Sequence, residues 1–185
     1  MSLIDVTPKM TSNATPVPYK VSASREWAPS YATWKAFTGV DKVACSNSWS
    51  ESYYAWKAFN KTNYDRQDCW YTNNARTGWL LIDLIKETYV NTIAITSRLE
   101  GGTDSGSGYA VSPRDFILQG SNNNKTFIDI KAFNGITTWG SNIKKIFQLD
   151  KNEKYRYYRL YVTQNNGGSA VGFESGYYPV ASTTL

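Results

Sequence analysis

The sequence predicts an all-β protein, an antiparallel jelly-roll β-sandwich in which helix is confined to a few short turns. Short apolar or alternating runs, separated by turn residues, fill the chain from Gly78 onward. Short strands at such spacing are typical of sandwiches and jelly rolls. No long amphipathic helical pattern is present, and the aromatic content of 15% suits both strands and binding surfaces.

The first part of the chain combines a polar lead-in with a local duplication. Residues 1–18 are rich in Pro, Ser, Thr and Asn, which predicts an extended segment. Residues 21–37 align with residues 43–59, and nine of the seventeen positions are identical. Each copy starts with a pattern that suits a short strand and ends in Trp-Lys-Ala-Phe, which suits one helical turn. We therefore expect residues 1–40 to pack on a sandwich formed by residues 41–185.

Seven β-segments are expected in the rest of the chain. The apolar run Trp79–Leu84 is short enough for a buried strand, and Ile93 and Ile95 share a face of the next one. The odd positions of residues 155–162 (Tyr, Tyr, Arg, Tyr) alternate with the even ones (Arg, Tyr, Leu, Val), as in a half-buried strand. The expected strands cover residues 79–84, 90–97, 115–121, 126–130, 143–149, 155–162 and 170–178, with a turn at 122–125.

The charge pattern argues against nucleic acid as a partner. The net charge is +5, but no basic stripe is present, and the cluster around Lys144 and Lys145 lies in or beside expected strands. No apolar stretch of about 18 residues exists, so we expect no membrane insertion. The first residues do not resemble a signal peptide. We expect an extracellular protein exported by another route, or one associated with a virion or similar particle.

The chain has two cysteines, Cys45 and Cys69. They can form a disulfide or stay as two buried free thiols. Nothing in their spacing identifies the redox compartment, so both alternatives stay open.

An ordered series of motifs between residues 43 and 178 carries a family resemblance. In this order they resemble the coagulation factor V/VIII type C, or discoidin, domain and its sugar-binding relatives, the family 32 carbohydrate-binding modules. The resemblance implies an eight-stranded, galactose-binding-domain-like sandwich with ligand loops at one end. The motifs are Ala55–Asn60, Cys69-Trp70, Gly78–Leu84, Ile93–Arg98, Ser112–Asn122, Tyr155–Val162 and Val171–Glu174.

The resemblance also implies a structural calcium ion beside the turn that ends in Phe59. The implied ligands are the Phe59 carbonyl, Asn60, Asp68 and Glu174. Calcium takes about six to eight oxygen ligands and favours carboxylates. Asn60 and Lys61 stand where the family has Asp and Gly, so the alternative is a polar turn held by side-chain hydrogen bonds.

For sugar binding, the resemblance implies an arginine at the end of the strand Ile-x-Ile-x-x-Arg, which is Arg98 here. A guanidinium can bind adjacent hydroxyls while an aromatic ring covers the apolar face of a pyranose. The alternative for Arg98 is a surface ion pair. The other candidates, in segments expected at the loop tips, are Trp49, Tyr53, Tyr109, Asn165 and Asn166.

Two of these candidates need comment. Tyr109 lies in a long Gly/Ser-rich loop, residues 100–113, of a kind that often carries function. Trp49 has a packing role as its alternative, because Trp27 occupies the matching position of the duplication. The pocket histidine of many relatives is absent, so the specificity of the family cannot be transferred.

These observations predict a non-catalytic carbohydrate-binding module that recognises a cell-surface polysaccharide or glycan through its loop tips. With no histidine, the chain lacks Ser-His and Cys-His pairs and His-bound metals. Residues 10–24 also resemble phage and prophage tail proteins, so the module is expected to be a receptor-binding part of a tail. The alternative is a homo-oligomeric structural component of such a particle without a sugar site. Lipid binding is disfavoured, because it needs exposed apolar side chains at the loop tips and the Gly/Ser-rich residues 100–113 do not supply them.

Overall fold

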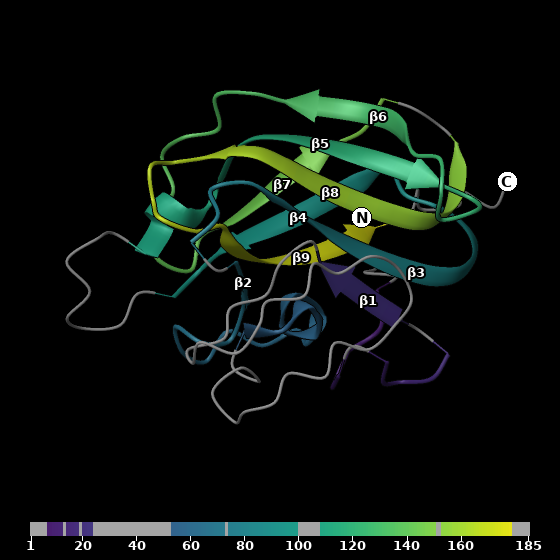
Figure 1. The fold of residues 1–185 in the computed structure, drawn as a ribbon, viewed down its shortest axis with the longest axis horizontal. Helices are drawn as coiled ribbons and strands as arrows, with labels where there is room; N and C mark the ends of the chain where they lie inside the picture. The colour runs from purple at the N-terminus through teal and green to yellow at the C-terminus, as the bar shows by residue number, and fades with distance from the viewer. Residues whose placement is uncertain are drawn as a thin grey trace, which may run out of the picture.

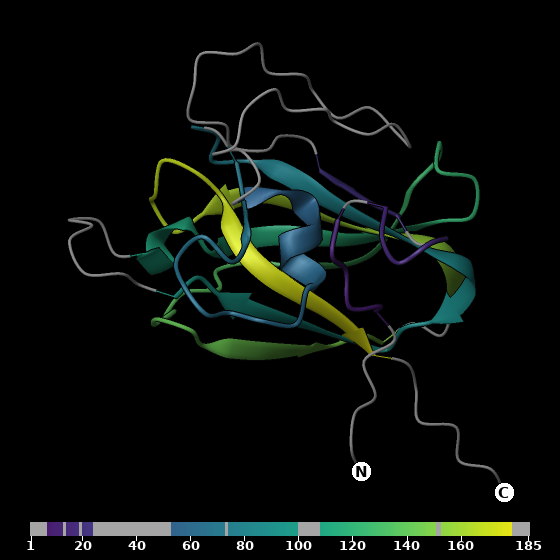
Figure 2. The ribbon, with the colours of Figure 1, turned by 90° about the horizontal axis from the view of Figure 1, so that it is seen from below.

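The computed structural model describes residues 7–12, 14–18, 20–23, 53–72, 74–99, 108–150 and 153–178. These residues form two antiparallel sheets that face each other (Figures 1 and 2). Helix in this part of the chain is limited to the 3-10 turns η2 (Ala55–Phe59) and η3 (Gly108–Val111). None of the described helices is long and apolar enough to cross a membrane.

The two sheets confirm the expected fold class. One sheet has the order β1-β3-β8-β5-β6 and the other the order β2-β9-β4-β7. All seven expected β-segments of the second part of the chain are strands, with bounds shifted by a few residues, and η2 is the expected helical turn. The strands are β1 (Lys20–Ala23), β2 (Trp70–Tyr71), β3 (Gly78–Tyr89), β4 (Thr92–Ser97), β5 (Pro113–Ser121), β6 (Ile128–Phe133), β7 (Lys144–Gln148), β8 (Lys154–Asn165) and β9 (Gly172–Tyr178).

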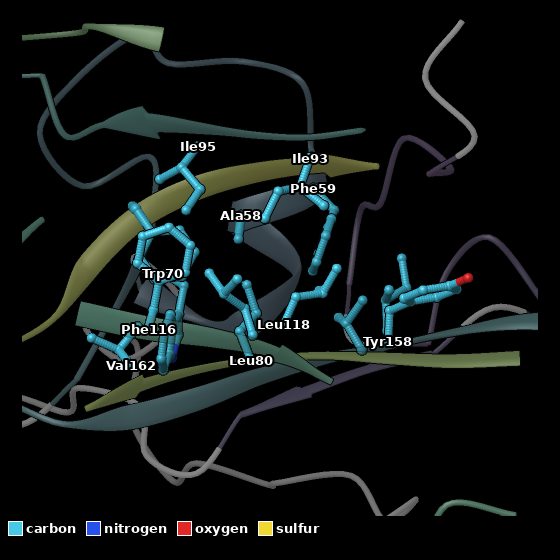
Figure 3. Packing of buried hydrophobic residues seen from close by; sticks show 14 of the residues in the cluster. Ala58, Phe59, Trp70, Leu80, Ile93, Ile95, Phe116, Leu118, Tyr158 and Val162 are labelled. Atoms are coloured by element: carbon cyan, nitrogen blue, oxygen red, sulfur yellow. The ribbon is translucent and has the colours of Figure 1, made fainter. Parts of the chain in front are cut away.

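The core fills the space between the sheets (Figure 3). Leu80 and Ile82 of β3 and Ile93 and Ile95 of β4 are completely buried. The apolar run at residues 79–84 therefore forms a central strand, as its composition predicts. Trp70 packs edge-on against Phe173, with ring centroids 5.2 Å apart. This T-shaped pair lies close to the end of the sandwich where β2 stops and β9 starts.

Strand β8 departs from strict alternation at one position. Tyr158, Leu160 and Val162 point inward, as expected, but Tyr155 is also buried although its odd position predicts the opposite face. The pairing with β3 shifts register between Asp83 and Thr88, next to the partner of Tyr155. A register irregularity changes which face a side chain takes, and a pattern within β8 alone cannot reveal it.

The lead-in packs on the sandwich in its described parts. Met10 is completely buried in the core, and its backbone N–H donates to the Phe59 carbonyl at 3.0 Å. Strand β1 pairs with β3 along its whole length. The expected burial of Trp34 and Phe37 lies outside the described residues. The division of the chain at residue 40 stays a prediction.

We expect Met10→Ala to lower the free energy of unfolding by about 2–5 kcal/mol, because it leaves a cavity in the core. Val17→Ala is the control in the same segment, since that side chain is 82% exposed and should change stability little. Urea denaturation of both variants measures the difference. Equal stability of the two would mean that the lead-in contributes nothing to the fold.

Candidate functional site

The candidate ligand surface is one end of the sandwich, which we call the loop end. There the end of β8 lies beside the starts of β3 and β5, and the end of β4 lies beside the start of β9. The connections between strands at this end include residues 74–77, 108–112, 134–143 and 166–171, on the left of Figure 1. The loop end is therefore where most of the predicted sugar-binding residues lie.

Arg98 follows β4 at the loop end, but it is buried, with 8% of its surface exposed. Its Nε donates to the Arg66 carbonyl at 2.5 Å. The guanidinium carbon lies 5.1 Å from the centroid of the Tyr71 ring, a cation–π contact. These two contacts join Arg98 to a backbone carbonyl and to an aromatic ring. They hold the guanidinium group of Arg98 in a fixed orientation.

Tyr53 joins the same group, which we call the arginine–tyrosine cluster: Tyr53, Arg66, Tyr71 and Arg98. The rings of Tyr53 and Tyr71 are 5.2 Å apart and tilted by 48°. Burial raises the pKa of the Tyr53 hydroxyl, and the positive charge of Arg98 opposes that rise. Two aromatic rings and a charged fork at the end of a strand can bind a polar ring-shaped ligand. Sequence patterns missed Arg66 and Tyr71, because neither belongs to the strand that carries Arg98.

Cys69 lies close to this cluster and is a free, completely buried thiol. Burial raises the pKa of the thiol to about 12, and Arg98 opposes the rise. Cys69 is therefore an unreactive core residue at neutral pH. Cys45 lies outside the described residues.

Asn165 and Asn166 lie at the loop end, but their amides bind backbone. The Asn165 amide donates to the carbonyls of Gly168 and Ala170 at 2.9 and 2.5 Å. The Asn166 amide donates to the carbonyls of Ser112 and Ile136 at 3.0 and 3.1 Å. Both asparagines thus hold the loop between β8 and β9 in shape.

The two remaining sugar candidates are not part of the cluster as described. Tyr109 is 37% exposed on η3. Its carbonyl accepts a bond from the Ser112 N–H at 3.0 Å, which closes the short helical turn. Trp49 lies outside the described residues. Arg98 and Tyr53 are therefore the predicted pair that the fold brings together.

A separate cavity of about 370 Å³ opens at the loop end. Its lining includes Asn165 and Asn166 together with Arg76 and Arg114, which the sequence did not single out. Arg76 lies in a polar turn before β3, and Arg114 follows Pro113 at the start of β5. An arginine next to a strand end does not by itself predict a binding site. That Arg76 and Arg114 line one cavity is visible only in the fold.

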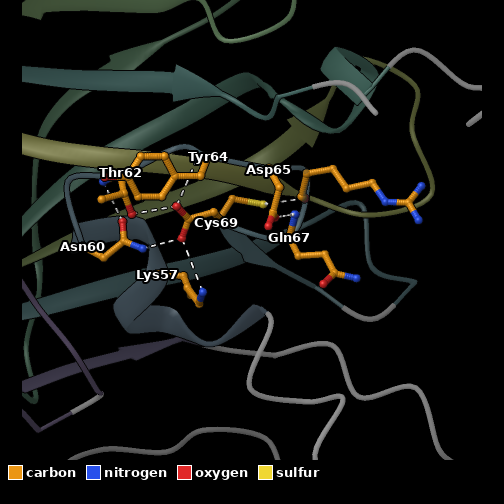
Figure 4. Close-up of polar contacts among 9 residues, drawn as sticks. Lys57, Asn60, Thr62, Tyr64, Asp65, Gln67 and Cys69 are labelled. Carbon is orange, nitrogen blue, oxygen red and sulfur yellow. Dashed lines mark hydrogen bonds and ion pairs between the residues drawn. The ribbon is translucent and has the colours of Figure 1, made fainter. Parts of the chain in front are cut away.

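Asn60, one of the expected calcium ligands, lies in a tightly bonded turn with Thr62 and Tyr64 (Figure 4). Asp68 accepts bonds from the Thr62 hydroxyl at 2.6 Å, the Tyr64 N–H at 3.2 Å and the Asn60 amide. Lys57 Nζ lies 3.4 Å from Asp68 Oδ1. Burial alone would raise the pKa of Asp68, but these hydrogen bonds and the charge of Lys57 hold it below its usual value.

The expected ligands fit a cation unequally. Asn60 turns its amide N–H group toward Asp68, and its oxygen accepts the Thr62 N–H at 2.9 Å, so it offers no free oxygen in this arrangement. The Phe59 carbonyl accepts the Met10 N–H. Glu174 is buried, and its Oε1 has no hydrogen-bond partner among the described residues. In the described part of the chain, no group of three or more His, Cys, Asp or Glu residues gathers in metal-binding geometry.

Glu174 shows the strongest electrostatic perturbation of the turn. Burial raises the pKa of its carboxyl to about 9, and the negative charge of Asp68 adds to the rise. A neighbouring cation would offset both causes. Of the four expected ligands, Glu174 offers the one oxygen without a hydrogen-bond partner among the described residues, whereas Lys57 and three hydrogen-bond donors already occupy Asp68. Calcium binding at this turn stays a prediction.

Comparison with protein families matches residues 42–174 to the F5/8 type C domain. Comparison with curated protein sequences gives no match.

Comparison with solved structures finds similar folds at low identity. The family 32 carbohydrate-binding module of EndoD from Streptococcus pneumoniae is 17% identical, with a TM-score of 0.59 over 95% of this chain and 99% of that one. The family 32 module of NanJ from Clostridium perfringens, in complex with galactose, is 17% identical, with a TM-score of 0.55 over 86% and 93%. CpGH89CBM32-5 from Clostridium perfringens, in complex with GalNAc-β-1,3-galactose, is 13% identical, with a TM-score of 0.57 over 86% and 94%.

Proposed function

The chain belongs to the F5/8 type C domain family, and on this premise we propose that it is a non-catalytic module that binds a cell-surface glycan through its loop end. The arginine–tyrosine cluster is the observation that carries the proposal. It combines an oriented guanidinium with two aromatic rings at the end of β4. The bound galactose and GalNAc-β-1,3-galactose of similarly folded modules support a glycan as the ligand class.

The cluster suggests how the sugar would be held. A guanidinium can donate two parallel hydrogen bonds to adjacent hydroxyls, which an ammonium cannot reproduce. The hydrogen bond from Arg98 Nε to the Arg66 carbonyl and the contact with Tyr71 fix the orientation of the guanidinium group before a ligand binds. Such preorganisation lowers the entropy lost on binding. The half-buried Tyr71 ring next to the guanidinium would supply an apolar surface for the C–H face of a pyranose.

A structural calcium ion is part of this proposal. Asp68 and Glu174 would hold it, and the ion would neutralise two buried carboxylates near the base of the loop end. The unpaired Glu174 oxygen supports this role. No catalytic role is assigned to the ion, and the absence of histidine supports a module without catalysis.

Display outside the cell, on a phage tail or a similar particle, belongs to the same proposal. This part of the proposal starts from the resemblance to tail proteins that the sequence of residues 10–24 suggests. A homo-oligomer or particle would let weak sites act together, because linked sites bind far more tightly than single ones. A chain that assembles such a particle without a sugar site is the alternative.

We expect the protein, displayed on a multivalent support, to bind at least one class of neutral glycan on an array. Binding should be weaker in chelator than in millimolar calcium, if the ion stabilises the loop end. A monovalent sample should bind far more weakly, because avidity is lost. Failure to bind any glycan under both conditions would remove the sugar site and favour the assembly role.

A further inference from the structure

The cavity at the loop end, which we call the arginine pocket, is chemically unlike the arginine–tyrosine cluster. Among the described residues that line it, all but one glycine are polar or charged, none is aromatic, and Arg98 is not one of them. The side chains come from four separate connections and strand ends. They include Arg76, Arg114, Thr137, Thr163, Gln164 and Asn166.

A pair of irregularities in the sheet builds one wall of the pocket. Pro113 pairs with Asn165 and Asp115 with Gln164, so Arg114 is an extra residue on β5. Phe116 then pairs with Val162, so Thr163 is an extra residue on β8, and the register recovers. Bulges redirect side chains and are frequent beside binding sites. Here both extra residues line the pocket.

The backbone groups around the two bulges have partners. The Arg114 carbonyl accepts the Ile136 N–H at 2.9 Å, and the Thr163 hydroxyl donates to the Asp115 carbonyl at 3.0 Å. These bonds stabilise a local geometry that leaves Arg114 outside the regular ladder. The two bulges are thus stabilised by hydrogen bonds within the protein.

The loop that carries Arg76 is tied to the opposite wall. The Thr72 N–H donates to the Val171 carbonyl, and the Val171 N–H donates to the Thr72 hydroxyl, both at 2.8 Å. The same hydroxyl donates to the Ala75 carbonyl at 2.6 Å, one residue before Arg76. The loop before β3 and the loop before β9 are therefore held together, which fixes the wall that carries Arg76.

The positive charge of Arg76 and Arg114 has no ion-pair partner among the described residues. Asp115 instead accepts the Gly135 N–H at 2.6 Å, and the Gln164 amide can bridge Asp115 Oδ2 at 2.9 Å and Arg114 Nη1 at 3.1 Å. Lys145 adds positive charge at the rim, where its Nζ lies 2.9 Å from the Thr137 carbonyl.

We propose that the arginine pocket binds the oxyanion of an acidic glycan, a carboxylate, sulfate or phosphate group, through Arg76 and Arg114. Guanidinium groups match the geometry of such oxyanions and form charge-assisted hydrogen bonds with them. A neutral pyranose is disfavoured there, because no aromatic ring is among the described residues that line the pocket. The assignment rests on the proposed function for the glycan, but the pocket itself is a separate site from the arginine–tyrosine cluster.

The test compares matched double variants in affinity gel electrophoresis at about 0.15 M salt, where long-range charge effects are screened. Arg76→Gln with Arg114→Gln removes the pocket cations. Lys86→Gln with Lys125→Gln removes the same charge from exposed side chains at the opposite end of the sandwich. The gels contain polygalacturonate, dextran sulfate, poly(glycerol phosphate) or neutral dextran, so the retarding polymer identifies the carboxylate, sulfate or phosphate source.

We expect at least one charged polymer, but not dextran, to retard the native protein. The arginine double variant should bind that polymer at least about tenfold more weakly, and the lysine double variant should bind it normally. No retardation of the native protein, or an equal loss in both variants, would overturn the proposal. Binding of neutral glycans by the arginine variant should persist, so failure of this pocket is distinguishable from failure of the sugar site.

Discussion

Replacing Glu174 by Gln is expected to make the protein more stable at pH 9 in the presence of a chelator. The Glu174 side chain is buried, and its Oε1 lacks a hydrogen-bond partner among the described residues. Burial, followed by the charge of Asp68, raises the pKa of this carboxyl from 4.5 to about 9. Gln is nearly isosteric and carries no charge, so it avoids the cost of ionising the group inside the protein.

The direction of the pH dependence follows from the raised pKa. Between pH 4.5 and about 9, the folded state keeps a proton that the unfolded state has released. The stability that this group contributes is therefore complete below pH 4.5 and is lost as pH rises to about 9. The loss is on the order of several kcal/mol. Urea denaturation at pH 5 and pH 9 measures it.

The Glu174→Gln variant should lack this decline, whereas the exposed control Glu87→Gln should keep it. If the native protein and Glu174→Gln show the same dependence on pH, Glu174 is solvated or paired in solution. Other groups also titrate in this range. The test therefore depends on the difference in pH dependence of the unfolding free energy between the native protein and Glu174→Gln.

Calcium is expected to reduce the difference in stability between the native protein and Glu174→Gln. An ion held by Asp68 and Glu174 favours the ionised carboxylate and binds the folded state alone. It then stabilises by about 2.7 kcal/mol at a concentration one hundred times Kd. The native protein should gain this increment in Tm measurements, and Glu174→Gln should lose it. Identical melting curves of the native protein in chelator and in millimolar calcium would exclude the ion.

Replacing Arg98 by Ala is expected to lower both stability and glycan binding. The substitution leaves the Arg66 carbonyl without its partner and removes the contact with the Tyr71 ring. Hydrogen bonds to charged groups and cation–π contacts of buried groups together give a loss of about 2–4 kcal/mol. For a chain of this size, Tm should fall by roughly 10 °C.

Arg98→Lys separates the structural role from the binding role. A lysine can keep a positive charge over Tyr71 and donate one hydrogen bond, so much of the stability should return. It cannot present two parallel donors to a sugar, so glycan binding should stay at least about tenfold weaker. Lys125→Ala serves as the exposed control. Full binding by Arg98→Lys would mean that the guanidinium does not contact the ligand.

Local sequence patterns were sufficient to predict most strands of the sandwich. The apolar run of β3 and the alternation of Tyr158, Leu160 and Val162 identify strands, because each pattern lies within one strand and reflects which face is buried. The helical turn Ala55–Phe59 was also visible in a few neighbouring residues. Tyr155 is the exception, since its burial depends on a register shift in another strand.

The candidate site was only partly accessible to such patterns. The family resemblance placed Arg98 at the end of a strand, and that position holds. Its burial under Tyr71 does not follow from β4, because Tyr71 and Arg66 come from a segment about 30 residues earlier. Likewise, Asn165 and Asn166 lie at the loop end as expected, but bonds to backbone carbonyls of other segments occupy their amides.

By itself, the sequence determined the fold class and most of the strands. These properties depend on hydrophobic periodicity and turn residues, which act over a few neighbouring positions. The position of the ligand loops at one end of the sandwich was implied by the family resemblance. The tertiary structure alone decided the arginine pocket. Arg76 and Arg114 line the same cavity because Thr72 bonds to Val171 and because paired bulges displace Arg114 and Thr163 from the ladder. Long-range hydrogen bonds and register between strands set such contacts, and no local pattern encodes them.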